Sequence, residues 1–151
     1  MPFIRVTMRW LAVDPGDKHL GVAVSDATGL IARPLATLRH QSYAESAARL
    51  VALADEHNVT GIIVGLPLDE DGEVGPQARK AIRLAEAIRA RTNLTVILHD
   101  ESLSSRTAQA LKRAACGKKR RAARNVSDHA AAAAVILQDY LDAHPSKAPS
   151  R

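Results

Sequence analysis

The sequence lacks the features on which secreted and membrane proteins depend. Cys116 is the single cysteine among 151 residues, which excludes a disulfide framework within the chain. No run of about 18 apolar residues is present that could span a membrane, and residues 1–9 lack the apolar centre of a signal peptide. These absences predict a protein of the reducing cytoplasm.

Aromatic residues are also scarce, at 3% of the chain, so the core must be built from Ala, Val, Leu and Ile. The hydrophobic fraction of 46% and the charged fraction of 25% are ordinary for a globular protein. The length suits one domain, which we expect to span residues 1–143. The polar tail at 144–151, with its Pro and Ser residues, is expected to be disordered.

Acidic residues are missing from one long segment. Between Glu101 and Asp128 there are 26 residues with eight basic and no acidic side chains, in a chain whose net charge is +5. The rest of the chain therefore has a net charge of −3. Such a concentration of positive charge is typical of a nucleic-acid contact surface. The basic residues of this segment are Arg106, Lys112, Arg113, Lys118, Lys119, Arg120, Arg121 and Arg124.

The first part of the chain predicts three strands. Residues 10–14 form a short apolar run that stops at Pro-Gly, and residues 19–26 form a second run only four residues later. So short a connection favours an antiparallel hairpin. A third strand is expected at 31–38, where Pro34 places it at a sheet edge or a bulge, because proline donates no ladder hydrogen bond.

Helices and strands then alternate. The all-apolar run at 61–64 indicates a central strand that is covered on both faces. With the hairpin in front, this order predicts an α/β fold with a five-stranded mixed sheet and helices on both faces. The expected helices are 43–57 with Ser42 as N-cap, 76–91 with Pro76 in its first turn, 104–115 and 126–143; the expected strands are 61–64 and a buried one at 94–98, and a basic loop covers 117–124.

Three acids occupy positions where acids are unusual. Asp14 ends the first strand, Glu101 closely follows the last, and Asp128 opens an alanine-rich helix. Strand ends converge at one edge of such a sheet, and clustered carboxylates favour a divalent cation. Oxygen ligands predict Mg²⁺ or Mn²⁺, and a pair of such ions hydrolyses phosphodiesters.

Each acid also has a purely structural explanation. Asp14 precedes Pro-Gly and can shape a turn, and Glu101 can be a surface acid beyond a strand. Asp128 near a helix N-terminus can simply interact with the helix dipole. Residue types and spacing alone leave these alternatives open.

Four collinear segments add a resemblance that covers about residues 10–142. In order, they are VDPGDKHLGVAVSD at 13–26, IIVGLPLDEDGEVGPQA at 62–78, HDESLSS at 99–105 and SDHAAAAAVILQDYL at 127–141. Together they resemble the four motifs of the YqgF family of RuvC-related, Holliday junction resolvase-like proteins. Four motifs in order are far more specific than any one of them.

The resemblance implies a ribonuclease H-like fold, with Asp14, Glu101 and Asp128 at the acidic catalytic positions. It also implies a metal-dependent nuclease acting in 5′-end maturation of the small-subunit ribosomal RNA precursor, or alternatively on four-way DNA junctions. Two departures stand out. Ser102 replaces an arginine of the family, and Ala131 stands where related nucleases have a fourth carboxylate, which Asp17 or Asp100 could replace.

Several alternatives stay open. Lys18 could contact a phosphate or be an ordinary exposed hairpin lysine. The motif Asp14-Pro15-Gly16 also resembles the first phosphate motif of actin-like kinases and ATPases, although those need two such domains. A non-catalytic RNA-binding assembly factor is a third reading. The sequence does not decide between a monomer and a homodimer.

Overall fold

A computed structural model describes residues 8–68, 71–100 and 126–144, and it confirms the predicted α/β fold. Five strands form one sheet in the order β3-β2-β1-β4-β5. The first three are antiparallel neighbours, whereas β4 and β5 run parallel to β1, so the sheet is mixed. The strands are β1 (Trp10–Pro15), β2 (His19–Ser25), β3 (Ala32–Arg39), β4 (Gly61–Leu66) and β5 (Thr95–Asp100).

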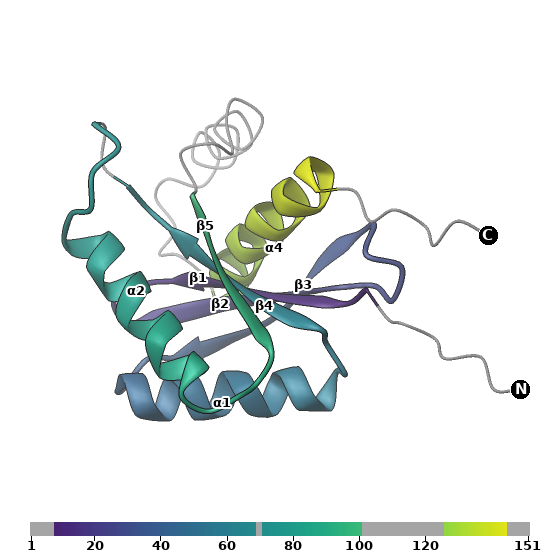
Figure 1. The fold of residues 1–151 in the computed structure, drawn as a ribbon, viewed down its shortest axis with the longest axis horizontal. Helices are drawn as coiled ribbons and strands as arrows, with labels where there is room; N and C mark the ends of the chain where they lie inside the picture. The colour runs from purple at the N-terminus through teal and green to yellow at the C-terminus, as the bar shows by residue number, and fades with distance from the viewer. Residues whose placement is uncertain (1–7, 69–70, 101–125, 145–151) are drawn as a thin grey trace, which may run out of the picture.

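Helices cover both faces of the sheet (Figure 1). Helices α1 (Tyr43–Glu56) and α2 (Pro76–Arg89) lie on one face, and α4 (Val126–Ala143) lies on the other. The helix predicted at 104–115 and the basic loop at 117–124 fall outside the described residues, as does most of the tail predicted at 144–151. Of the helices that are described, none has the length and apolar character needed to cross a membrane.

The two faces have separate cores. Val13, Ile62 and Leu84 belong to the larger core, between the sheet and the pair α1 and α2. Ala12 and Ala23 belong to the smaller core, where the sheet meets α4. The alanines let the helix backbone lie close to the sheet at this point, and Trp10 and Tyr140 pack against the same core, with ring centroids 5.4 Å apart.

The local signals at element ends act as predicted. The Oγ atom of Ser42 accepts a hydrogen bond from the backbone N–H of Glu45 at 3.1 Å and so caps α1. Pro76 opens α2, where its missing N–H costs no hydrogen bond. Pro34 lies in β3, which is an outer strand, and the β2–β3 register shifts beside it, between Val22 and Ala23. Pro34 therefore lies both in an edge strand and beside a bulge, which are the two positions predicted for it.

One strand differs from expectation. The strand at 94–98 is predicted to be buried, but β5 is an outer strand in which only Val96 and His99 are buried, while Thr95 is exposed and the other three residues are half-buried. Its apolar run resembles that of β4, which is central and covered on both faces. Composition alone does not separate the two, because the order of strands in the sheet determines how much of each is covered.

The side chain of Gln138 clamps helix α4 to the turn of the β2–β3 hairpin. The Oε1 atom of Gln138 accepts a hydrogen bond from the backbone N–H of Ala32 at 2.9 Å, and its Nε2 donates to the carbonyl oxygen of Leu30 at 3.0 Å. The amide thus pairs with the backbone as a neighbouring strand would. This explains why a polar residue interrupts the apolar end of the last motif.

Replacing Gln138 with leucine should therefore destabilise the fold by about 1–2 kcal/mol, because two backbone groups lose their partner. Denaturant unfolding of Gln138→Leu measures this difference. The matched control is Gln41→Leu, since Gln41 is exposed and precedes α1. Equal unfolding free energies for the two variants would show that the clamp contributes nothing.

Asp26 organises the turn between β2 and β3. Its carboxylate accepts hydrogen bonds from the Thr28 hydroxyl and from the backbone N–H groups of Leu30 and Ile31. These bonds, led by that from Thr28, lower the pKa of Asp26 below its usual value. Asp26, the last residue of the first sequence motif, thus forms a turn. It follows the end of β2, whereas Asp14 lies beside the start of that strand.

A lowered pKa in the folded state makes this contribution depend on pH. It is fully present above the unfolded value of 3.8 and disappears as the pH falls through the lower, folded value. Asp26→Asn should cost about 1 kcal/mol at pH 7 and progressively less below pH 3.8. Urea unfolding across this range tests it, with Asp55→Asn at an exposed position of α1 as control. A loss of stability that does not change with pH would contradict it.

Candidate functional site

The carboxyl ends of three strands meet at one edge of the sheet. Val13 of β1 pairs with Val64 of β4, which pairs with Leu98 of β5, so these parallel strands end at the same level. The antiparallel strand β2 begins there, since Leu20 lies opposite Pro15. In open α/β sheets such an edge is where ligands bind.

Asp14 lies at this edge, on the face that α4 covers. Side chains alternate between the two faces of a strand, and Ala12 is buried in the α4-side core. Val13 belongs to the opposite core, beneath α1 and α2. Asp14 therefore projects at the margin of the α4-side core, where it is partly exposed.

Gly21 brings the start of α4 to the same place. It pairs with Asp14 across the β1–β2 hairpin, and a Cβ atom at this position would overlap the carbonyl oxygen of His129. The first turn of α4 thus rests on the backbone of β2, and Asp128 immediately precedes the contact. Asp14 and Asp128, two of the three predicted carboxylates, therefore lie at the same edge of the sheet. The absence of a side chain at Gly21 is what allows helix α4 to come this close.

The position of Asp128 fits the structural role considered for it. Asp128 lies in the first turn of α4, where a negative charge interacts favourably with the helix dipole. The same positive helix end faces the sheet edge that carries Asp14. A helix N-terminus placed there favours any anion bound at the edge, so the structural and functional roles of Asp128 are compatible.

The rest of the predicted site falls mostly outside the described residues. Glu101 directly follows Asp100, the last residue of β5, and is not itself described. The same holds for the basic residues between 106 and 124, whereas Lys18 is exposed on the β1–β2 turn. Among described residues, no group of three or more His, Cys, Asp or Glu side chains is placed to hold a metal ion. Of the three predicted metal-binding carboxylates, the structure therefore describes two, Asp14 and Asp128.

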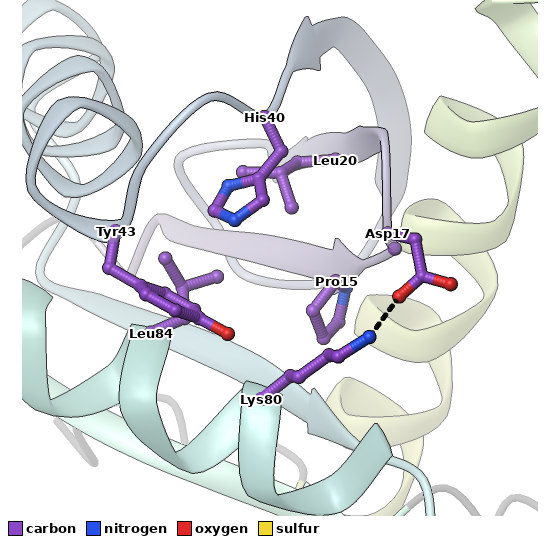
Figure 2. A pocket seen from close by; sticks show the side chains of 8 residues that line it. Pro15, Asp17, Leu20, His40, Tyr43, Lys80 and Leu84 are labelled. Carbon is purple, nitrogen blue, oxygen red and sulfur yellow. Dashed lines mark hydrogen bonds and ion pairs between the residues drawn. The ribbon is translucent and has the colours of Figure 1, made fainter. Parts of the chain in front are cut away.

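Neither candidate for the fourth carboxylate shares the face of Asp14. Asp100 pairs with Leu66, which packs against the α1- and α2-side core. Asp17 accepts a hydrogen bond at 2.5 Å from Lys80 of α2, on that same side (Figure 2). This hydrogen bond and the charge of Lys80 lower the pKa of Asp17, and Asp17 in turn raises that of Lys80.

The histidines next to the acids make local contacts. His99 is buried, and its Nε2 lies 3.1 Å from an oxygen of Asp139 on α4. His129 stacks on His19 of β2, with ring centroids 5.2 Å apart. These contacts bind the end of β5 and the start of β2 to α4, so the imidazoles hold the elements that carry the site in place.

Comparison with protein families identifies this arrangement. The family model described as "RuvX: Holliday junction resolvase" matches residues 8–143. The chain belongs to the RuvX family. The match confirms the resemblance drawn from the four sequence motifs, and it covers β1 through α4, including the edge that carries Asp14 and Asp128.

Relatives in this family align over nearly their whole length. A protein of Myxococcus xanthus is 42% identical over 138 residues, covering 91% of this chain and 89% of the relative. A protein of Geobacillus kaustophilus is 44% identical, covering 89% and 98%. Both carry the name "Putative pre-16S rRNA nuclease".

Solved structures show the same ribonuclease H-like fold. RuvC of T. thermophilus, in complex with a Holliday junction substrate, superposes with a TM-score of 0.60 at 19% identity, covering 91% of this chain and 96% of that one. The fowlpox virus Holliday junction resolvase superposes with a TM-score of 0.54 at 16% identity, covering 90% and 99%. At these identities the likeness establishes the fold.

The Gly21 contact should be intolerant of any side chain. Gly21→Ala forces the first turn of α4 away from β2, and overpacking of this kind costs about 1–3 kcal/mol. Thermal or denaturant unfolding measures the loss. Gly75→Ala is the control for the added methyl group, because a Cβ at Gly75 meets no atom within 4 Å; Gly75 is the N-cap of α2, so this control should itself lose a fraction of about 1 kcal/mol. A Gly21→Ala protein as stable as Gly75→Ala would contradict the close approach.

Proposed function

We propose that this protein is a divalent-metal-dependent nuclease that hydrolyses phosphodiester bonds at the edge defined by Asp14 and Asp128. The observation that carries the proposal is the Gly21 contact, which places the first turn of α4 beside Asp14. Glu101, directly after β5, is the third carboxylate of the proposed set. Their oxygen-only chemistry suits Mg²⁺ or Mn²⁺.

In this proposal the chain positions the reacting groups. Asp14, on the central strand β1, would supply oxygen ligands to the divalent cations together with Glu101 and Asp128. Bound in a pair, such ions activate a water molecule and neutralise the phosphate that it attacks. The N-terminus of α4 adds a positive dipole at the same edge. Lys18 and the basic residues at 106–124 supply contacts along the nucleic-acid backbone.

The proposed substrate is the precursor of 16S ribosomal RNA, and the proposed location is therefore the cytoplasm. Support comes from the names of relatives that are 42% and 44% identical over most of their length. A four-way DNA junction is the second candidate, supported by the description of the family model. The structural neighbours that act on junctions are below 20% identity, so they support the fold more than the substrate.

The proposal predicts metal-dependent cleavage that requires Asp14. End-labelled precursor RNA and a four-way DNA junction, each incubated with Mn²⁺ or with EDTA, should show cutting only with the metal. Asp14→Asn should reduce the rate at least a hundredfold, because a neutral amide is a weaker ligand than a carboxylate. The RNA should be cut faster than the junction.

Asp55→Asn is the matched control, since Asp55 is exposed on α1 and the substitution makes the same change of charge. It should cleave at the native rate. Faster cutting of the junction would favour the resolvase reading. No cleavage of either substrate by folded native protein that still binds RNA would instead support a non-catalytic assembly factor.

A further inference from the structure

A small cleft lies on the opposite side of the β1–β2 turn from Asp14. Its volume is about 80 Å³, and its floor includes Leu20 and Leu84 of the core beneath α1 and α2. Asp17 of the turn and Lys80 of α2 form its charged rim (Figure 2). The turn that follows Asp14 therefore separates two different surfaces, and Asp14 and the start of α4 lie on the other one.

Two rings form the aromatic wall of this cleft. His40 and Tyr43 lie edge to face, with ring centroids 5.1 Å apart. The Nδ1 atom of His40 is 2.7 Å from the hydroxyl of Ser46 in α1, which fixes its ring. Tyr43 packs against the core, and its hydroxyl is directed toward Lys80 (Figure 2). The wall is thus preformed and offers ring surface beside a cation.

The charged rim is easily exchanged for a ligand. The side chains of Asp17 and Lys80 are 59% and 46% exposed, and an ion pair in solvent contributes little to stability. A bare phosphate site would not include a carboxylate, because the two repel each other. A ribose-phosphate unit fits both groups, since lysine donates to the phosphate and aspartate accepts from a ribose hydroxyl.

We propose that the Asp17–Lys80 cleft binds a ribose-phosphate unit of the RNA strand that is cut at Asp14, and so favours RNA over DNA. The inference rests on the proposed nuclease function. Asp14 and Asp17 are three residues apart in sequence, which limits the distance between their Cα atoms to about 11 Å. A strand crossing the turn at exposed Lys18 spans this distance with a few nucleotides. The 2′-hydroxyl is the group that distinguishes RNA from DNA.

Binding of labelled single-stranded RNA and of DNA of the same sequence, measured by fluorescence anisotropy in EDTA, tests the cleft without cleavage. Lys80→Gln should weaken binding of both at least fivefold and reduce the salt dependence by about one phosphate contact. Asp17→Asn should weaken RNA at least fivefold and DNA by less than twofold. Arg91→Gln, more than two helical turns from Lys80, is the control and should change neither.

A charge-exchanged variant separates recognition from structure. Asp17→Lys combined with Lys80→Asp keeps the ion pair but reverses its groups. If the pair only stabilises the fold, this variant binds RNA normally, and the proposal is wrong. If the cleft reads a ribose-phosphate, RNA binding stays weak while thermal unfolding matches that of the native protein. Equal losses for RNA and DNA in Asp17→Asn would also overturn it.

A free ribonucleotide has the same chemistry as one unit of the strand. The experiment therefore includes titration of native protein with 5′-AMP, which should compete with RNA only weakly. Competition as strong as that of unlabelled RNA, lost in Asp17→Asn, would assign the cleft to a free nucleotide and overturn the strand proposal. Cleavage by native protein that depends on Asp14 remains a separate result, so failure of the cleft leaves the nuclease proposal standing.

Discussion

The architecture of the site depends on a contact between two backbones. At Gly21 the first turn of α4 rests directly on β2, with no side chain between them. Alanines on both partners, Ala12 and Ala23 of the sheet and Ala133 of α4, belong to the same interface and allow this closeness. Asp14 is the hairpin partner of Gly21, so the approach of the helix also determines where Asp128 lies relative to Asp14.

Sequence reasoning predicts much of this fold because the decisive signals are local. Ser42 as a cap, Pro34 at an edge and the apolar run of β4 each act through their immediate neighbours or through hydrogen-bonding capacity. The pairing of Asp17 with Lys80 has no such signal, since it joins residues 63 positions apart in sequence. The outer position of β5 also arises only when the strands are assembled into a sheet.

In the candidate site, too, local signals are predictable from the sequence, whereas the relative placement of the residues is not. Its acids are recognisable in sequence because Asp14 ends an apolar strand, Glu101 closely follows another and Asp128 opens an alanine-rich helix, and the family motifs give that pattern a meaning. The carboxyl edge of the sheet then brings Asp14 and Asp128 to one face, which neither composition nor spacing could establish. Asp26 shows the converse, since a motif acid that could be mistaken for a catalytic one serves a turn. Position within the sheet separates the two roles.

The irregular outer strand β3 has a consequence for self-association. Pro34 removes one hydrogen-bond donor from this strand, and the register shift beside it disturbs the regular ladder. Arg33 and Arg39 are exposed along the same strand and add like charges. An edge of this kind is a poor template for another strand. Two copies of the chain are therefore hindered from joining their sheets through β3, and a symmetric pair would have to meet through another surface.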